Sequence, residues 1–199
     1  PDDDVCLVIK DMGGKSFYKG QTGSDWVREM QASGRCAEIE FIDDELAPSE
    51  MPGLYTACDV LVHPYRGEGF GLPIAEAMSC GLPCIVTRGG AADDFCSDAE
   101  SWGVSAKRVP VPGGKVGPFD TVSAPWWLEP SLPDLVDKFR QARTDRRARR
   151  SKADAARRRV VQGLQTIVVA TAVSRTGVVR EVGPVLGAVG LHHIARGIN

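Results

Sequence analysis

The chain has 199 residues, with 24 Lys or Arg against 26 Asp or Glu, a formal net charge of −2 and an isoelectric point near 6.0. This length suffices for one domain of medium size with an extension, and for a substantial hydrophobic core. The balanced charge excludes an overall electrostatic attraction to nucleic acid.

Short β-branched runs alternate with segments of helix length. The predicted strands are residues 5–9, 39–42, 59–62, 84–87 and about 104–109. Strands that alternate with helices are typical of a parallel sheet whose two faces are covered by helices. We therefore predict an α/β fold with a doubly wound, Rossmann-like parallel sheet flanked by helices.

Three helices between these strands have readable ends. Ser24 is a candidate cap for a helix over DWVREMQAS, which Gly34 ends. A weaker helix, with a Pro-Gly pair inside it, begins near Ser49. The third covers PIAEAMSC, with Pro73 at its first position, where a missing N–H costs nothing, and Gly81 at its end.

The second half of the chain is less regular. Residues 110–130 are rich in Pro and Gly and predict an ordered surface loop without regular structure. Ser131 and Asp134 resemble a capping box for the next helix. From residue 164 the composition shifts to Val, Ala, Gly and Thr, and its longest apolar run is too short to span a bilayer. The predicted division is a globular domain at 1–163 and a tail of unassigned structure at 164–199.

Basic residues are concentrated in one segment. Residues 140–159 contain ten Lys or Arg and two Asp, which leaves 14 basic and 24 acidic groups in the rest of the chain. The sequence favours a solvated helix face here; a dedicated anionic site, or peripheral contact with a membrane, is the alternative.

The six cysteines include no CxxC pair, and four lie in or beside apolar runs, where cysteine packs as a small apolar group. Without a signal-peptide pattern, this usage predicts a reducing, cytoplasmic setting. The chain starts with PDDD directly before an apolar strand, which suggests a fragment of a longer protein. No His or Cys cluster has the spacing of a metal site.

The segment YRGEGFGLPIAEAMSCGLP joins a predicted strand to a predicted helix. Ligands of parallel sheets gather where a strand ends and a helix begins. The backbone N–H groups of Phe70, Gly71 and Leu72 precede the first helical turn and suit a phosphate, and glycine at 69 and 71 permits close approach. Glu76, one turn into the helix, can accept hydrogen bonds from vicinal sugar hydroxyls. A nucleoside diphosphate fits this order of groups, but a tight turn with a solvated Glu76 is equally compatible with the spacing.

A longer stretch, YTACDVLVHPYRGEGFGLPIAEAMSCGLPCIVTRGG, resembles the donor-binding half of the family 4, or group 1, retaining glycosyltransferases of GT-B architecture. That family carries a Glu-x7-Glu motif in an EGFGxxxxEAMAxGxPVI element followed by a strand and a GG turn. The matching residues are Glu68, Gly69, Phe70, Gly71, Leu72, Pro73, Glu76, Ala77, Met78, Gly81, Pro83, Gly89 and Gly90. Weaker similarity extends from about Val5 to Arg159.

The resemblance implies roles for the two glutamates of the motif and for the turn between them. Glu76 would hold the ribose hydroxyls, and the Gly69–Leu72 turn would hold the diphosphate through the amides of Phe70, Gly71 and Leu72. Glu68 would contact the donor sugar near the reacting carbon and is the candidate catalytic residue. No metal or other cofactor is implied, so the helix dipole and cations must neutralise the leaving diphosphate.

Three further donor-binding candidates lie outside the motif. Ile42 falls where the family packs the nucleotide base. The two basic residues that usually neutralise the diphosphate belong to a GR…KG element, which would lie upstream of Pro1. Lys10 and Lys15 are the nearest substitutes. Lys10 either points into the cleft or simply ends a strand, and the two interpretations are equally compatible with the sequence. Arg66 either helps to balance the diphosphate or pairs with Glu68.

Other polar and aromatic residues have two interpretations each. His63 either touches donor phosphate or packs at a strand end, and the second is favoured. Asp93 either replaces a glutamate that the family often has after its GG turn or caps a helix, and the second is slightly favoured. Trp126 and Trp127 either stack on sugar or cover an apolar edge, and again the second is favoured.

The resemblance thus implies a retaining hexosyltransferase domain that binds a nucleotide sugar and, with a missing N-terminal acceptor domain, transfers the sugar to a hydroxyl of a glycan or small-molecule acceptor. The fragment alone is expected to be inactive. The alternatives are a non-catalytic nucleotide-sugar-binding module, or an enzyme of the same scaffold that performs phosphorolysis or epimerisation. A dehydrogenase is disfavoured because no GxGxxG follows the first strand.

Overall fold

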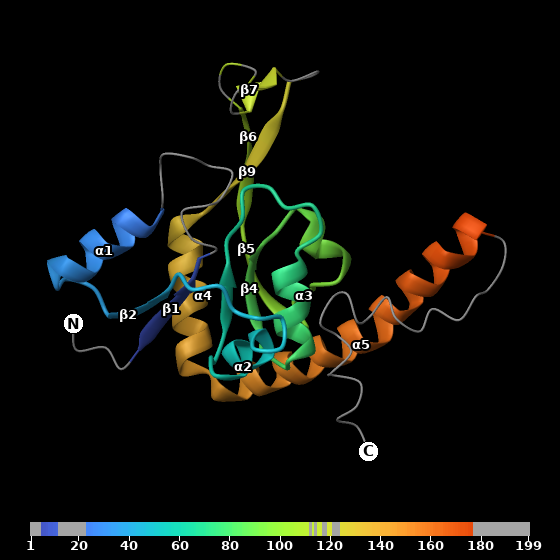
Figure 1. Cartoon of the computed structure of the whole chain (residues 1–199), viewed down its shortest axis with the longest axis horizontal. Helices are drawn as coiled ribbons and strands as arrows, with labels where there is room; N and C mark the ends of the chain where they lie inside the picture. Colours follow the sequence, from blue (N-terminus) through green and yellow to red (C-terminus); the bar gives the residue numbers. More distant parts are fainter. Residues whose placement is uncertain are drawn as a thin grey trace. The chain divides into compact units, whose positions relative to one another are not determined.

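The computed structural model describes residues 5–11, 23–111, 113, 115–116, 119–120 and 124–176. They divide into two compact units, Pro1–Glu50 and Met51–Asn199, which we call the N-terminal unit and the main unit. Each is described by itself. Figure 1 labels most of their helices and strands.

The N-terminal unit is a βαβ element. Strand β1 (Cys6–Lys10) pairs in parallel with β2 (Glu38–Ile42), in a register from Cys6 opposite Glu38 to Lys10 opposite Ile42. Parallel neighbours need a crossover, and helix α1 (Gly23–Ser33) lies between the two strands in the sequence. Gly34 has φ 61° and ends α1, as predicted. The two predicted strands and the helix are confirmed, with ends shifted by one or two residues.

The main unit is built on a parallel sheet of order β3-β4-β5. Its strands are β3 (Leu61–His63), β4 (Cys84–Thr87) and β5 (Ser101–Val104). Its helices are α2 (Met51–Thr56), α3 (Leu72–Ser79), the short 3-10 helix η1 (Ala91–Asp94), α4 (Leu132–Thr144) and α5 (Arg146–Thr176).

Every residue of β4 is buried, because helices cover both faces of the sheet. Successive side chains of a strand point to opposite faces. Cys84 and Val86 accordingly pack with α3 and with Val160 of α5, whereas Ile85 packs with Ala142 of α4. Figure 1 shows α3 and α4 on opposite sides of β4 and β5. The predicted doubly wound α/β fold is confirmed.

The prediction of one strand over 104–109 was wrong. The backbone leaves the parallel sheet after Val104, and the next strand, β6 (Ala106–Pro110), pairs antiparallel with β9 (Trp126–Pro130). The predicted irregular loop at 110–130 was also wrong, since it contains β9 and a small ladder of β7 (Lys115–Val116) with β8 (Phe119–Asp120). The prolines of this region suggested a loop, but proline is tolerated at the ends of strands. The composition therefore gave no sign that β6 pairs with the distant strand β9.

The predicted cap of α4 is confirmed. Ser131 Oγ accepts a hydrogen bond from the Asp134 backbone N–H at 3.4 Å. The Asp134 carboxylate instead accepts one from the Ser105 backbone N–H at 2.7 Å, which ties α4 to the point where β5 ends. Helix α5 continues to Thr176, into the segment from residue 164 for which the sequence predicted no structure. Residues 177–199 lie outside the described part of the chain. The predicted boundary between a globular domain and a tail at residue 163 stays a prediction.

Candidate functional site

The segment between β3 and α3 forms the strand-turn-helix predicted from the sequence. β3 ends at His63 and α3 begins at Leu72, with Gly71 as its cap residue at φ 92° and no side chain capping the helix. A Cβ on Gly71 would lie 3.1 Å from Ile74 Cδ1, so both backbone angle and space require glycine there. In the first helical turn the N–H groups of Ile74 and Ala75 both donate to the Gly71 carbonyl at 3.0 Å, and Pro73 has no N–H. The amides that remain at the positive end of the helix dipole are therefore those of the turn itself and of Leu72.

The carboxylate of Glu68 bonds to this turn. Its Oε1 accepts hydrogen bonds from the backbone N–H groups of Gly69 at 3.0 Å and Phe70 at 3.4 Å. Its Oε2 lies 3.4 Å from Nε2 of His63. The turn thus binds an anionic group, and the Phe70 amide predicted to be open is hydrogen-bonded to the chain's own carboxylate.

The environment of Glu68 keeps this carboxylate ionised. Partial burial by itself would raise the pKa of Glu68. Hydrogen bonds from Phe70, His63, Gly71 and Gly69 outweigh burial and hold the pKa below its usual value. His63 therefore contacts Glu68, and it also packs against Tyr65 with ring centroids 5.9 Å apart, which agrees with the hydrogen-bonding and packing role favoured for it.

Glu76 lies in α3 with its side chain half-buried. The hydroxyl of Tyr55, on α2, donates a hydrogen bond to Glu76 Oε2 at 2.9 Å. Tyr55 is only 8% exposed; burial, together with the charge of Glu76, raises the pKa of its phenol, so it remains a donor. This contact fixes one carboxylate oxygen and leaves Oε1 for another donor. Tyr55 is a site residue that the sequence did not reveal, because only the fold brings α2 next to α3.

Arg66 has a different partner from the one considered in the sequence. Its Nε lies 2.8 Å from Glu129 Oε2 and its Nη2 donates to Glu129 Oε1 at 2.9 Å, so the alternative of a pair with Glu68 was wrong. The guanidinium also lies over the ring of Trp127, 5.4 Å from its centroid. The Leu128 backbone N–H donates to the Arg66 carbonyl at 2.8 Å. Strand β9 thereby holds the segment that leads into Glu68.

The two tryptophans of β9 have separate environments. Trp127 contacts Arg66, and its buried Nε1 has no hydrogen-bond partner in the part of the chain that the structure describes. Trp126 is 49% exposed, with the guanidinium of Arg108 4.2 Å from its ring centroid. The preferred interpretation, two rings covering an apolar edge, thus fits Trp127 better than Trp126.

The GG turn after β4 packs against the segment before Glu68. A Cβ on Gly90 would lie 2.7 Å from the Tyr65 ring, and the Tyr65 hydroxyl accepts a hydrogen bond from the Ala92 N–H at 3.3 Å. Asp93 Oδ2 accepts one from the Gly89 N–H at 2.7 Å. Asp93 therefore fastens the turn onto η1, although it lies inside that helix and the cap residue is Gly90, with no side chain capping it.

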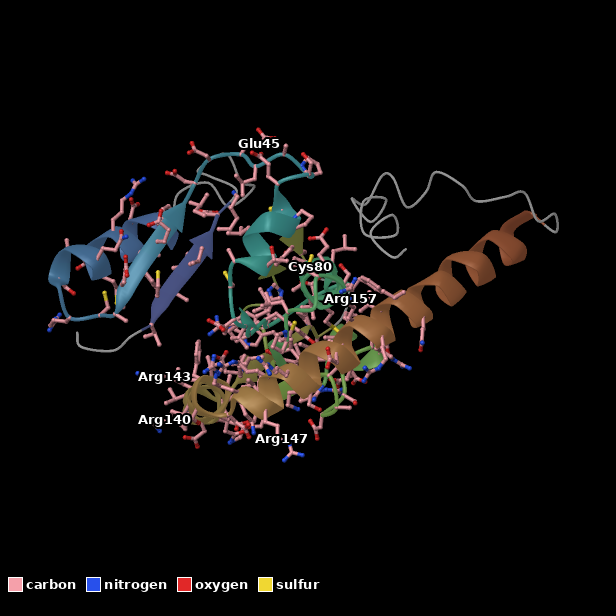
Figure 2. All side chains as sticks on the ribbon, turned by 90° about the horizontal axis from the view of Figure 1, so that it is seen from below. Glu45, Cys80, Arg140, Arg143, Arg147 and Arg157 are labelled. Carbon is pink, nitrogen blue, oxygen red and sulfur yellow. The ribbon has the colours of Figure 1, made fainter. Side chains whose placement is uncertain are left out.

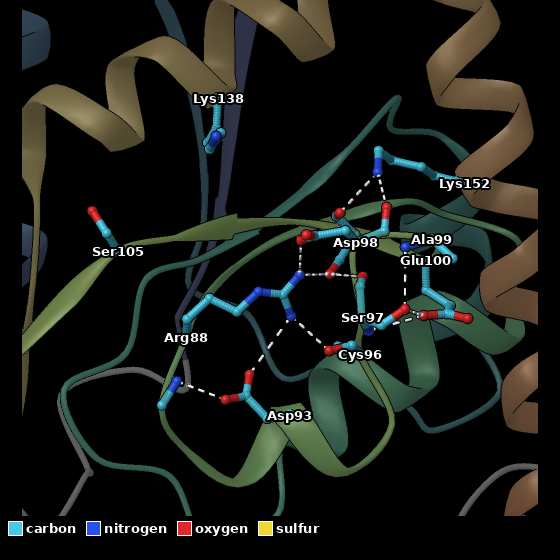
Figure 3. A network of polar contacts seen from close by, with 12 residues as sticks. Arg88, Asp93, Cys96, Ser97, Asp98, Ala99, Glu100, Ser105, Lys138 and Lys152 are labelled. Atoms are coloured by element: carbon cyan, nitrogen blue, oxygen red, sulfur yellow. Dashed lines mark hydrogen bonds and ion pairs between the residues drawn. The ribbon is translucent and has the colours of Figure 1, made fainter.

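Arg88, beside this turn, is the centre of a polar network that the sequence did not suggest (Figure 3). Its guanidinium donates to the Cys96 carbonyl and to Asp98 Oδ1, each at 2.6 Å, and lies 3.6 Å from Asp93. A Cβ on Gly103 would lie 1.9 Å from Arg88 Nε, so that glycine makes room for the arginine. The network connects the GG turn to the loop before β5.

Lys10 and Ile42 belong to the N-terminal unit. They are paired at the carboxyl ends of β1 and β2, and the Asp11 N–H donates to the Ile42 carbonyl at 3.0 Å. Lys10 Nζ donates to the carbonyl of Asp11. The structure thus brings these two candidates to one sheet edge; Lys15 lies outside the described residues.

Two other kinds of site can be assessed in the described residues. They contain no group of three or more His, Cys, Asp or Glu placed to hold a metal ion, and His192 and His193 lie outside them. Burial raises the pKa of the Cys80 and Cys84 thiols, which keeps both protonated and poorly nucleophilic. No helix within the described ranges is both long and apolar enough to cross a membrane.

Comparison with known proteins identifies the domain. The family model for glycosyl transferases group 1 matches residues 14–109. The chain is 41% identical over 98 residues to O-antigen chain mannosyltransferase B of Escherichia coli, covering 49% of this chain and 20% of that protein. It is 44% identical over 95 residues to D-inositol 3-phosphate glycosyltransferase of Corynebacterium jeikeium, covering 45% and 21%. The matching regions thus span about a fifth of these two relatives.

Solved structures give the architecture. Anabaena HepE in complex with UDP-glucose superposes with a TM-score of 0.60 at 18% identity, covering 86% of this chain and 39% of HepE. WaaG, a glycosyltransferase involved in lipopolysaccharide biosynthesis, superposes with a TM-score of 0.55 at 21% identity, covering 79% and 36%. The fold is one half of the GT-B architecture. The family match over residues 14–109, the two relatives and the shared fold together support a group 1 glycosyltransferase domain, and the resemblance noted in the sequence is confirmed.

Proposed function

We propose that this domain binds the nucleoside diphosphate sugar of a retaining hexosyltransferase, and that the intact protein transfers the sugar to an acceptor hydroxyl. One observation carries the proposal. A single strand-turn-helix holds an anionic group on its backbone amides at one end and a fixed, half-buried carboxylate, Glu76, at the other. HepE, solved with UDP-glucose, shares the fold, and the relatives named above transfer sugars according to their names.

In this proposal Glu76 holds the ribose. Tyr55 occupies Oε2, so Oε1 accepts a hydrogen bond from a ribose hydroxyl, and the second hydroxyl shares the carboxylate. The ionised form suits the task, because a carboxylate accepts such hydrogen bonds strongly and has no proton of its own to place.

The amides of the Gly69–Leu72 turn receive the diphosphate. Glu68 bonds to two of these amides in the structure, so a phosphate must displace its carboxylate. The released carboxylate turns toward the donor sugar, where it hydrogen-bonds hydroxyls near the reacting carbon. When the bond from that carbon to the phosphate oxygen breaks, charge develops on the diphosphate, and the amides and the α3 dipole stabilise it without a metal ion.

Cations would add to this stabilisation. Arg66 is already paired with Glu129, so it contributes only by exchanging that carboxylate for a phosphate. Lys10 is the candidate of the N-terminal unit, and Ile42 beside it is the candidate contact of the base. Acceptor choice is assigned to an N-terminal domain of the intact protein, and the setting proposed for the reaction is the cytoplasm.

The proposal is tested by thermal unfolding with UDP-, GDP- and ADP-sugars. At a concentration about a hundred times its Kd, the correct donor should raise the Tm by roughly 5 °C, since only the folded chain binds it. Glu76→Ala should remove this gain. Glu45→Ala, which deletes an exposed carboxylate, serves as the matched control and should keep it. If no nucleotide sugar changed the Tm of the folded chain, the proposal would be wrong.

A further inference from the structure

Five exposed arginines lie along helix α5, and we call this group the arginine face. Counted from the first, the other four follow after one, four, eleven and twelve residues, which places all five within about 120° of the helix circumference. Each is exposed, whereas Ala156 and Val160 of the same helix are buried against the core. Figure 2 labels Arg147 and Arg157 along α5, and Arg140 and Arg143 on the helix before it. The members of the face are Arg146, Arg147, Arg150, Arg157 and Arg158.

The other basic residues of this helix before residue 164 have structural partners. Arg149 donates to the carbonyl of Arg143 at 2.7 Å, Lys152 to that of Ser101 at 2.9 Å, and Arg159 to that of Asp94 at 3.3 Å. The side chains of the five members of the arginine face have no hydrogen bond or ion pair within the described part of the chain. Their role in holding the fold is therefore small, and their charges are available to a partner.

The charge of the chain is segregated around this face. Residues 140–159 carry ten basic and two acidic groups, while the rest of the chain carries 14 basic and 24 acidic groups. Asp154 is the acidic residue among the arginines of α5, and it does not pair with them in the described structure. Like charges this close repel one another, and a surface of negative charge relieves that repulsion.

Two features favour a lipid surface over a nucleic acid. Residues 140–163 contain no aromatic side chain on which a base could stack. The backbone of α5 continues from the arginine face into residues 164–176, LQTIVVATAVSRT, whose single charged residue is Arg175. A basic helix that continues into an apolar sequence suits the boundary between headgroups and acyl chains.

We propose that the arginine face binds the headgroup phosphates of an anionic lipid bilayer, with α5 lying along the membrane surface. This goes beyond donor binding, and neither proposal depends on the other. The contact holds the domain at a membrane and leaves the turn between β3 and α3 to bind its ligand. Each arginine near an anionic surface strengthens binding by a similar increment, so the face acts as a sum of its members.

The test measures co-sedimentation of the whole 199-residue chain with vesicles. An equal mixture of phosphatidylcholine and phosphatidylglycerol should bind the chain, and phosphatidylcholine alone should not. The triple variant Arg146→Gln/Arg147→Gln/Arg150→Gln should bind the mixed vesicles roughly 100-fold more weakly. Glutamine has about the helix propensity of arginine, so α5 should persist, as circular dichroism will verify.

A matched variant separates the face from net charge. Arg28→Gln/Arg35→Gln/Lys107→Gln removes three exposed positive charges elsewhere and should retain most of the binding. Equal loss in both triple variants would overturn the proposal, as would binding of a DNA duplex in place of the vesicles, or no binding of the anionic vesicles. The Tm gain with donor should be unchanged in the triple variant of the face, which keeps this test distinct from that of the donor site.

Discussion

Charged side chains are partnered in the turn between β3 and α3 and unpartnered on the arginine face of α5. In the turn, Glu68 is bonded to backbone amides and Glu76 to Tyr55, so each carboxylate has a fixed position. On the arginine face, five charges have no internal partner. A partnered charge such as that of Glu68 must exchange its partner when a ligand binds, whereas an unpartnered charge can meet a charged surface without such an exchange. Helices α3 and α5 pack on one core, so mutations can test the contrast within a single unit.

The largest difference should appear in stability. Met78 of α3 is fully buried, so Met78→Ala should lower the free energy of unfolding by roughly 3 kcal/mol, through lost burial and an unfilled cavity. Arg147→Ala, on the arginine face, should change it by less than about 0.5 kcal/mol. Urea unfolding measures both. A similar cost for the two variants would mean that the arginine face stabilises the fold.

A smaller effect is expected where α2 supports the site. Tyr55→Phe removes the hydroxyl that donates a hydrogen bond to Glu76. This loss should lower the free energy of unfolding by about 1 kcal/mol. If Glu76 holds ribose, the loosened carboxylate should also weaken nucleotide binding several-fold, as titration calorimetry would measure. Unchanged affinity would show that Tyr55 does not position Glu76 for the ligand.

The smallest expected effect is on the stability of the fold at acidic pH. The pKa of Glu68 is lower in the folded chain than its ordinary value of 4.5, so its contribution to stability is complete above that pH and is lost as the pH falls through the folded pKa. Glu68→Gln should therefore be less stable than the wild type at pH 7, and the gap should narrow below about pH 4. Urea unfolding at the two pH values tests this. A gap that stayed constant would show that the amides do not favour the ionised carboxylate.

Local signals in the sequence predicted the parts of the fold that depend on near neighbours. Pro73 and Gly81 indicated the limits of α3, and Ser131 indicated the start of α4, because capping and backbone preference act within a few residues. The motif from Glu68 to Glu76 predicted the strand-turn-helix for the same reason. Its resemblance to a known family identified the domain.

Local sequence patterns could not predict contacts between segments that are distant in the chain. Arg66 pairs with Glu129, 63 residues further along the chain, and the partner of Tyr55 depends on how α2 packs against α3. The pairing of β6 with β9 was hidden by the prolines at its ends. The bond from Glu68 to the turn amides is local, but the sequence suggested that those amides were open to ligand.

The central claim is that the turn amides bind a diphosphate in competition with Glu68, while Glu76 holds the ribose. Calorimetric titration of the chain with UDP, GDP and ADP, compared across Glu68→Gln and Glu76→Ala, tests it most directly. For the preferred nucleotide, affinity should rise several-fold when the competing charge of Glu68 is removed and should fall at least about tenfold when Glu76 is removed. A loss of affinity in both variants, or no change in either, would contradict it.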